Sequence, residues 1–252
     1  MVAEITVLGS GTRVPLRERS MSGYAVSRPD FFLLLDCGGG VVRRALEAGL
    51  PILHVDAILF SHLHLDHVAD LPELLWALDG EGHQRAARPL QLFGPPGFGD
   101  FWGGLSDLYG KWLRRLPVPI HVREVQREGF RLGPWQIETL PMFHGTPANG
   151  YRLECEGKIL AYTGDTGPCE EIAALARSAD WLIIECSYPD GHAMPTHLTA
   201  SEVGQLASRA NCQRVLLTHF YPECFEVDVA SQCRKFFPGT IELANDLQRL
   251  IL

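Results

Sequence analysis

Short apolar runs that stop at glycines or polar residues recur along the whole chain, and they predict strands buried inside sheets. Runs of this kind lie at residues 5–11, 31–40, 56–61, 90–99, 131–142, 151–157, 158–165, 181–185 and 213–219. Continuous apolar stretches bounded by turn residues are typical of strands that are covered on both faces. Residues 241–252 resume the apolar pattern, and we expect them to close the edge of a sheet.

A helical period of apolar residues lies between several of these runs. We expect helices at 41–49, 71–80, 170–179 and 200–210, and a partly helical segment at 101–117. Thr199 and Glu202 have the spacing of a capping box at the start of one of these helices. Strands that come in groups and then meet helices predict sheets with helices on their outer faces. Because no linker or low-complexity tract interrupts the pattern, we expect residues 1–252 to form one domain.

The composition is that of an ordinary globular protein, with 46% hydrophobic and 21% charged residues. A formal net charge of −8 creates no overall field that would gather long polyanions, so a long nucleic acid is a disfavoured partner unless a local basic patch binds it. The seven cysteines are odd in number and include no CxxC pair, which favours free thiols in the reducing cytoplasm. The first residues lack the pattern of a signal peptide, and the longest apolar runs, such as 31–35, are too short to cross a membrane.

The segment SHLHLDH at 61–67 carries the strongest chemical signal. Four residues with metal-binding side chains lie within six positions, directly after an apolar run: His62, His64, Asp66 and His67. Side chains two positions apart in an extended segment point the same way, so His62 and His64 can bind one ion. Where the chain then turns toward the next helix, Asp66 and His67 can face a second ion. Imidazole and carboxylate ligands suit zinc, manganese or iron.

Three further candidate ligands lie at the ends of downstream strands: His144, Asp165 and His219. Strand ends that lead into turns are the usual place for functional residues on a sheet scaffold. Taken singly, each of these residues is as readily explained by a structural role as by a metal. As a set of polar residues that end apolar strands they support one another, and the two carboxylate oxygens of Asp165 could bridge two ions.

Together these residues resemble the metallo-β-lactamase superfamily, with SHLHLDH followed by His144, by Asp165 in TGDT and by His219 in LTHF. The resemblance extends over residues 5–252 and implies an α+β fold, a four-layer αββα sandwich with a dinuclear site at the edge of its sheets. It implies that one ion is held by His62, His64 and His144, and the other by Asp66, His67 and His219. Asp165 would lie between the two divalent ions, for which zinc is the first expectation and manganese or iron are the alternatives.

Four other segments are similar to ribonuclease Z and its relatives within this superfamily: ITVLGSGTRVP, LLLDCGGG, GYRLECEGKILAYTGDT and IIECSYPDGHAMPTHLTASE. In the last of these, Glu185 ends an apolar strand and His197 precedes a helix. Those relatives carry a glutamate and a proton-donating histidine at these places. The resemblance therefore implies a phosphodiesterase in which Asp66, Glu185 and His197 are catalytic, a metal-bound hydroxide is the nucleophile and His197 is the general acid.

The chemistry of the leaving group agrees with a histidine that donates a proton. Two metal ions can stabilise the attacking and leaving oxygens of an in-line displacement at phosphorus. The alkoxide of a sugar is a poor leaving group that gains from a general acid, whereas a thiolate gains far less. His197 held by the carboxylate of Glu185 would meet this need, although His197 could instead be an exposed loop residue.

The sequence also departs from ribonuclease Z. That family carries an arm that grips tRNA between the residues that match His144 and Asp165, whereas only twenty residues separate them here. DCGGG at 36–40 replaces the usual DCGEG. We therefore expect the substrate to be a small or cyclic phosphodiester or a short nucleotide. The alternatives are a tRNA 3′ endonuclease, a hydrolase of thioesters, lactones or sulfate esters and, least expected, a metal-binding protein without turnover.

Three features leave alternatives open. The insert at 80–117 carries four arginines among aromatic residues, Arg85, Arg88, Arg114 and Arg115. An amphipathic cover of a sheet is favoured for it over a wall of the substrate pocket. Four histidines have no motif support and are expected to be structural or exposed: His54, His83, His121 and His192. A homodimer stays an open alternative, because the sequence carries no signal for the oligomeric state.

Overall fold

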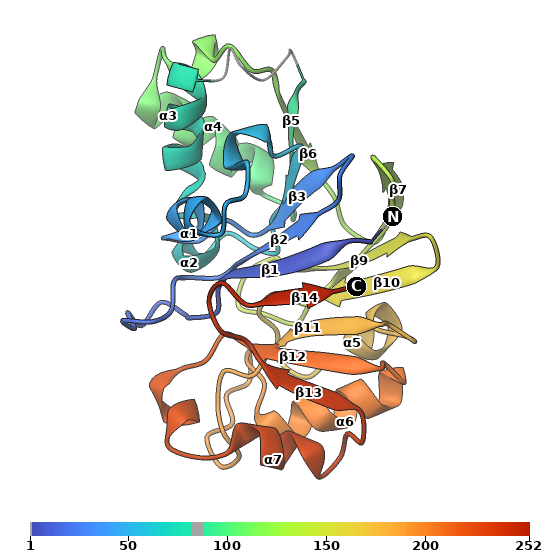
Figure 1. The fold of residues 1–252 in the computed structure, drawn as a ribbon. Helices are drawn as coiled ribbons and strands as arrows, with labels where there is room; N and C mark the ends of the chain where they lie inside the picture. Colours follow the sequence, from blue (N-terminus) through green and yellow to red (C-terminus); the bar gives the residue numbers. More distant parts are fainter. Residues whose placement is uncertain (1, 82–87) are drawn as a thin grey trace.

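Two seven-stranded mixed sheets form the centre of the computed structural model, which describes residues 2–81 and 88–252 (Figure 1). The first sheet has the order β14 (Arg249–Ile251), β1 (Glu4–Gly9), β2 (Gly23–Ser27), β3 (Phe32–Leu35), β4 (Ala57–Leu59), β5 (Leu90–Gly94) and β6 (Ile120–Glu124). The second has the order β13 (Thr240–Leu243), β12 (Arg214–Thr218), β11 (Trp181–Glu185), β10 (Lys158–Tyr162), β9 (Asn149–Cys155), β8 (Trp135–Pro141) and β7 (Gly129–Leu132). Strands β3 to β6 and β10 to β13 are parallel, and the other pairs are antiparallel.

The core between the sheets follows from the pattern of apolar positions along the strands. In β8, Trp135 and Ile137 are buried while Gln136 and Glu138 are exposed, which is the alternation of a strand with one face on a core. In β11 all five residues are buried, because helices cover its second face. Large aromatic side chains from both sheets fill the space between them: Tyr24, Trp135, Tyr151, Tyr162 and Trp181.

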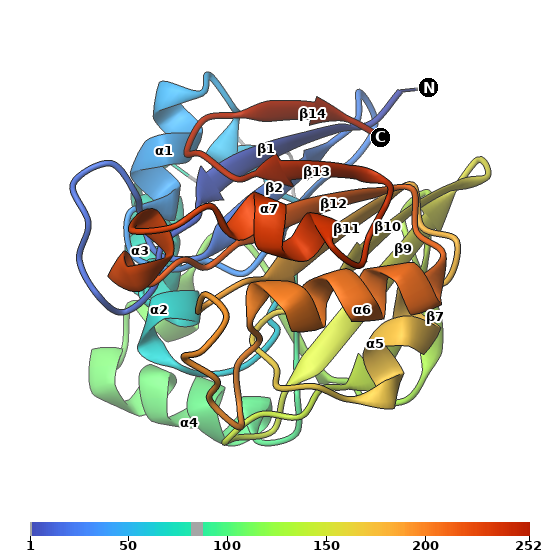
Figure 2. The ribbon, with the colours of Figure 1, turned by 90° about the horizontal axis from the view of Figure 1, so that it is seen from below.

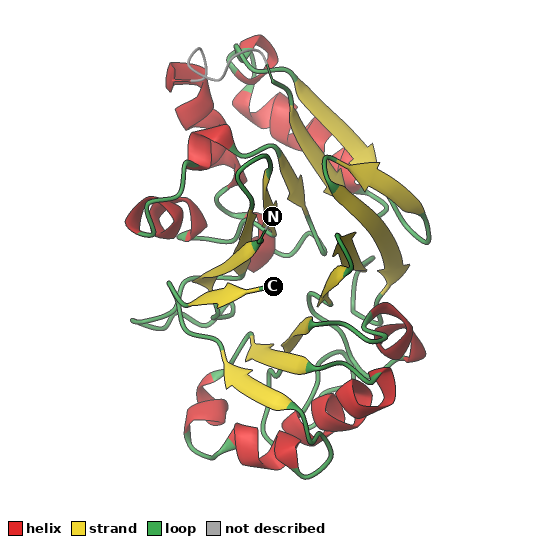
Figure 3. Ribbon diagram, turned by 45° about the vertical axis from the view of Figure 1, so that its right-hand side comes forward, coloured by secondary structure: helices red, strands yellow, loops and turns green. Residues whose placement is uncertain are grey.

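Helices cover the outer face of each sheet (Figures 2 and 3). The first sheet is covered by α1 (Val41–Glu47), η1 (Ile52–His54), α3 (Leu71–Glu81), α4 (Phe98–Tyr109) and η3 (Leu113–Arg115). The second is covered by α5 (Glu170–Leu175), α6 (Ala200–Ala210), η4 (Pro222–Phe225) and α7 (Val229–Arg234). The predicted α+β, four-layer αββα sandwich is therefore confirmed. Within the described ranges, no helix is both long and apolar enough to cross a membrane.

Two of the predicted strands divide in the structure. The segment 131–142 lies in a hairpin, because the chain turns at Gly133 (φ +55°) between β7 and β8. Residues 241–252 lie in β13 and β14, which close the edges of different sheets. The apolar pattern does not predict β2 or β6. The first is five residues long with Gly23 and Ser27 at its ends, and the second is an edge strand with a half-polar sequence, IHVRE.

The described part of the insert, residues 80–81 and 88–117, packs on the first sheet as the favoured interpretation predicts. Its helix α4 places three aromatic side chains against the outer core: Phe98, Phe101 and Trp102. Arg88 is paired with Asp56, 3.1 Å away. Arg85 and His83 lie outside the described residues.

The seven cysteines are all free thiols, and six of them are buried. This agrees with the expectation that no disulfide framework supports the fold. Burial raises the pKa of Cys212 and of Cys233 to about 12, so these thiols stay protonated and pack as small apolar side chains.

Loops from both sheets meet at one edge of the sandwich. In the second sheet β8, β10, β11 and β12 run in the same direction, so their carboxyl ends share this edge. The end of β4 in the first sheet joins them there, because the N–H of Asn149 donates to the carbonyl of Ser61 at 2.8 Å. This edge therefore receives all the loops that carry the predicted ligands.

Candidate metal centre

The segment SHLHLDH turns from the end of β4 into the four-residue helix α2 (Leu65–Val68). His64 keeps an extended backbone, with φ −66° and ψ 150°, and the helix begins at the next residue. His62 and His64 therefore point to the same side, and His62 Nε2 lies 3.0 Å from His64 Nδ1. Asp66 and His67 follow in α2, and both are buried.

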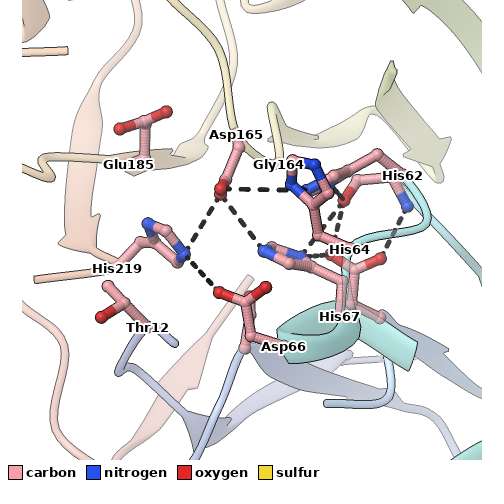
Figure 4. Close-up of polar contacts among 12 residues, drawn as sticks. Thr12, His62, His64, Asp66, His67, Gly164, Asp165, Glu185 and His219 are labelled. Carbon is pink, nitrogen blue, oxygen red and sulfur yellow. Dashed lines mark hydrogen bonds and ion pairs between the residues drawn. The ribbon is translucent and has the colours of Figure 1, made fainter. Parts of the chain in front are cut away.

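Asp165, which follows β10, lies at the centre of the cluster (Figure 4). Its Oδ1 is 3.3 Å from His67 Nε2 and 3.4 Å from His219 Nε2. Its Oδ2 is 3.9 Å from His62 Nε2. One carboxylate thus faces three imidazoles that come from both sheets.

The other predicted ligands extend the cluster on two sides. On one side, His144 Nε2 lies 3.2 Å from His64 Nδ1. On the other side, His219 Nε2 lies 3.5 Å from Asp66 Oδ2. In each of two triads the ligand atoms lie within 4.8 Å of one another: His62 with His64 and His144, and Asp66 with His67 and His219. The structure thus brings together all seven residues that the sequence singles out.

The chemistry of these donors fits divalent metal ions. Two buried imidazole nitrogens have no hydrogen-bond partner among the described residues, His67 Nε2 and His219 Nε2. A buried polar atom without a partner is costly, and a metal ion would satisfy both nitrogens. Imidazole nitrogens together with carboxylate oxygens are the donor set that zinc and similar ions take in proteins.

Asp36, which the ligand pattern does not predict, holds His67 in place. Its Oδ2 accepts hydrogen bonds from His67 Nδ1 at 2.7 Å and from Ser61 Oγ at 2.6 Å, and its Oδ1 accepts from the N–H of Ser61 at 2.6 Å. The hydroxyl of Tyr162 also donates to Oδ2. Because Nδ1 is directed at Asp36, Nε2 of His67 faces Asp165. Asp36 directly follows an apolar run, and the same strand-end signal that marks the ligands could have found it.

Burial and charge set the protonation of the cluster. Burial, followed by the charge of His67, lowers the pKa of His62 well below its usual value. Burial also acts to lower the pKa of His67, but Asp165 and Asp36 outweigh it and raise this pKa well above its usual value. Burial acts to raise the pKa of Asp165, but the charges of His219 and His67 hold it well below its usual value. The central carboxylate is therefore ionised and suited to a cation.

His197 lies beside the cluster and is paired with Glu185 at the end of β11. Its Nδ1 lies 3.1 Å and 3.2 Å from the two carboxylate oxygens of Glu185. Glu185 is 1% exposed and also accepts from the N–H of Thr166 at 2.6 Å. Burial acts to lower the pKa of His197, but the hydrogen bond and the charge of Glu185 outweigh it, so this pKa is raised. One ring nitrogen of His197 lies within 4.8 Å of ligand atoms of Asp165 and His219.

Ser187 links this pair to the predicted ligand His219. Its hydroxyl donates to Glu185 and accepts from Nδ1 of His219 at 3.0 Å. In the same way, Nδ1 of His144 donates to the carbonyl of Thr196 at 3.0 Å. Partners of this kind orient the rings of metal-binding histidines and select which nitrogen faces the ion. No sequence pattern marks Ser187, because its partner His219 is 32 positions away.

Two residues of the cluster have left-handed backbone conformations, which are rare outside glycine. They are Asp36, with φ +59°, and His219, with φ +57°. Such conformations persist where the surrounding contacts hold them, and they gather at functional sites. Gly164 also has a positive φ of +59°, and a Cβ there would lie 2.3 Å from the Cβ of Ser61. Only glycine therefore lets the loop that carries Asp165 approach the SHLHLDH segment so closely.

The family model of the Beta-lactamase superfamily domain matches residues 32–220, and the chain belongs to this superfamily. Fold, ligand cluster and family together define a metal-dependent hydrolase. Among curated relatives, Ribonuclease Z of Mycobacterium marinum (strain ATCC BAA-535 / M) is 28% identical over an alignment of 275 positions, which spans 98% of each chain. An uncharacterized protein of Mycobacterium leprae (strain TN) is 34% identical over an alignment of 254 positions, which spans 96% of this chain and 86% of its own.

Solved structures with the same fold come from several proteins. The metallo-beta-lactamase fold protein YhfI from Bacillus subtilis has a TM-score of 0.87 at 23% identity and covers 100% of both chains. The short form of human tRNase Z has a TM-score of 0.81 at 22% identity and covers 98% of both chains. A diphosphatase from the PhnP family has a TM-score of 0.76 at 21% identity and covers 98% of this chain and 97% of its own. These likenesses confirm the predicted fold.

Proposed function

We propose that the protein is a dinuclear phosphodiesterase that acts on small or cyclic phosphodiesters or on short nucleotides. The observation that carries this proposal is the pair of His197 and Glu185, 3.1 Å apart, beside the ligand cluster. A protonated histidine is useful when the leaving group is a poor one, such as the alkoxide of a phosphodiester. A thioester loses a thiolate, which needs a proton donor much less, so the pair favours phosphodiesters over thioesters.

Two divalent ions, with zinc as the first candidate, would bind the cluster. Two triads and a shared carboxylate would hold them: His62, His64 and His144 for one ion, Asp66, His67 and His219 for the other, and Asp165 between them. When bound, such ions stabilise charge on phosphate oxygens and lower the pKa of a bound water. The ring nitrogens of His67 and His219 that lack a hydrogen-bond partner among the described residues support this assignment.

The side chains of the protein would divide the remaining work. Asp66 has one carboxylate oxygen 3.5 Å from His219, and its other oxygen can accept a hydrogen bond from the attacking water. His197 would donate its proton to the leaving oxygen, while Glu185 holds the ring by Nδ1. The raised pKa of His197 favours the protonated form that this step needs.

The short connection between His144 and Asp165 supports a small substrate. It contains a turn and the hairpin of β9 and β10, and nothing longer that could grip a large nucleic acid. The second candidate is a tRNA 3′ endonuclease, which is favoured by the similarity to Ribonuclease Z of Mycobacterium marinum over 98% of both chains.

A hydrolysis screen tests this proposal. Protein reconstituted with zinc or manganese would be offered alkyl and aryl phosphodiesters, cyclic nucleotides, dinucleotides, thioesters and lactones, with a precursor tRNA as a separate arm. We expect turnover of the phosphodiesters, and a loss of that turnover in His197→Ala at unchanged metal content. Turnover confined to thioesters or lactones would overturn the proposal, and efficient trimming of the precursor tRNA with no action on small diesters would favour the second candidate.

A further inference from the structure

A pair of stacked tyrosines lies against His197. The rings of Tyr188 and Tyr221 are 4.9 Å apart, with 15° between their planes. Each ring lies 6.1 Å from the ring of His197, at 74° for Tyr188 and 69° for Tyr221. Tyr221 also lies 6.0 Å from the ring of His219. The tyrosine pair therefore borders both the proposed proton donor and a proposed metal ligand.

Backbone hydrogen bonds fix both tyrosines. The N–H of Ala200 donates to the carbonyl of Tyr188 at 3.2 Å, and the N–H of Tyr221 donates to the carbonyl of Ser187 at 3.3 Å. Tyr221 is 7% exposed, whereas Tyr188 is only half-buried. Tyr188 is therefore the more exposed ring of the pair.

An arginine without a carboxylate partner lies on a loop near the tyrosine pair. Arg13 is exposed on the loop after β1, and in residues 2–81 and 88–252 no ion pair engages it. A backbone hydrogen bond anchors this loop, because the N–H of Phe220 donates to the carbonyl of Ser10 at 3.3 Å. Phe220 lies between His219 and Tyr221 in the chain, so this hydrogen bond brings the loop that carries Arg13 beside the tyrosine pair.

We propose that Tyr188, Tyr221 and Arg13 form a subsite for the leaving group, and that this group is a nucleoside that carries a second phosphate. The inference rests on the proposed phosphodiesterase function. Because His197 would protonate the leaving oxygen, the side chains next to His197 contact whatever departs with that oxygen. The half-buried ring of Tyr188 offers a stacking surface to a nucleobase. The guanidinium of Arg13 offers two parallel donors to a phosphate. A leaving group without a ring or a charge would use neither.

Binding of AMP and of ribose 5-phosphate tests the stacking contact, because ribose 5-phosphate carries a hydroxyl group where AMP carries the base. Calorimetric titration of the zinc-loaded protein should show that AMP binds about tenfold more tightly. The preference should vanish in Tyr188→Leu and persist in Tyr188→Phe, which keeps the ring. Tyr109→Leu, which removes an exposed tyrosine from α4, is the control and should keep the preference. Equal affinities in the wild type, or a preference that survives in Tyr188→Leu, would overturn the inference.

Adenosine 3′,5′-bisphosphate tests the arginine in the same way. It should bind more tightly than AMP, and Arg13→Gln should abolish this difference in affinity. Arg43→Gln removes the same charge from α1, where Arg43 is paired with Glu47 at 3.0 Å, and it should keep the difference. If Arg43→Gln and Arg13→Gln weaken binding equally, the attraction is a general effect of charge and Arg13 forms no subsite.

Hydrolysis separates this inference from the function on which it rests. Two diesters would be compared, a dinucleotide that releases a nucleoside and a nucleotide methyl ester that releases methanol. Tyr188→Leu should lower kcat/KM about tenfold for the dinucleotide and leave the methyl ester unchanged. An equal loss on both diesters would mean that Tyr188 only supports His197, and the subsite would be refuted. If the wild type hydrolyses neither diester but prefers AMP through Tyr188, the proposed function fails while the nucleoside subsite stands.

Discussion

The substitution Asp36→Asn tests how the cluster is held together. Asp36 is fully buried and accepts four hydrogen bonds, two from Ser61, one from His67 Nδ1 and one from the hydroxyl of Tyr162. Asparagine keeps the volume but replaces one acceptor oxygen by a nitrogen that can only donate. A donor of Ser61 or of His67 then faces this nitrogen, which is itself a donor, so their hydrogen bond is lost.

The size of the effect follows from these contacts. A hydrogen bond to a charged group contributes about 1.5–3 kcal/mol, and a buried donor without a partner costs roughly 1–3 kcal/mol. We therefore expect Asp36→Asn to lower the free energy of unfolding of the metal-free protein by about 2–4 kcal/mol. Because Asp36 orients His67, the affinity for zinc should fall by about 10–100-fold.

Two assays separate these effects. Urea unfolding in the presence of a chelator measures stability, and competition with a chromophoric chelator measures zinc affinity. Asp180→Asn is the matched control, because Asp180 is a buried carboxylate at the opposite end of β11 from Glu185, bonded to Lys158 at 2.8 Å. The control should lose stability and keep its zinc affinity. Zinc affinity at the wild-type level in Asp36→Asn would refute the claim that Asp36 orients a ligand.

Four further predictions concern the metals, a helix cap and the proton donor. Asp165→Ala should lower the occupancy of both metal sites, whereas His67→Ala should mainly lower the occupancy of one. Elemental analysis of the two variants measures this, and full occupancy in Asp165→Ala would show that Asp165 does not bridge the two ions. A chelator should lower the melting temperature and added zinc should restore it, because the ions bind only the folded cluster. A melting temperature that does not change with zinc would contradict the proposed metal site. Thr199→Ala should lower the free energy of unfolding in urea by about 1 kcal/mol, because Thr199 and Glu202 form the capping box of α6 and the hydroxyl of Thr199 donates to the carboxylate of Glu202 at 2.8 Å; an unchanged free energy of unfolding would show that the Thr199 side chain does not stabilise the helix. Glu185→Gln should keep its metals and lose less activity than His197→Ala on the same diester; a larger loss would mean that Glu185 does more than orient the histidine.

The layers of this fold can be predicted from the sequence because their signals are local. Five consecutive apolar residues at 181–185 mark a strand covered on both faces, and the contact of Glu202 with Thr199 marks the start of α6. The break at Gly133 is less visible, since the apolar pattern of 131–142 continues across it. Edge strands such as β6 are partly exposed, so their polar residues hide the strand pattern.

The clustering of the candidate ligands can be predicted for a similar reason, whereas the residues that hold them in place cannot. Four of the candidate ligands lie in one short motif, so their metal-binding chemistry can be inferred before the fold is known: His62, His64, Asp66 and His67. The hydrogen bond between Tyr162 and Asp36 joins residues that are 126 positions apart, so no local sequence pattern predicts it. The stacking of Tyr188 on Tyr221 likewise depends on the way two loops meet. The catalytic roles of Glu185 and His197 stay predictions that rest on their geometry.

The leaving-group dependence of His197→Ala tests the central claim most directly. The variant would be assayed on an alkyl phosphodiester and on a p-nitrophenyl phosphodiester, with its fold and its metal content measured in parallel. If His197 donates a proton, the variant keeps its metals and loses about 10²–10⁴-fold in rate on the alkyl diester. It should lose much less on the p-nitrophenyl diester, because p-nitrophenolate leaves readily as an anion. An equal loss on both substrates, or the loss of a metal ion from the variant, would contradict the account.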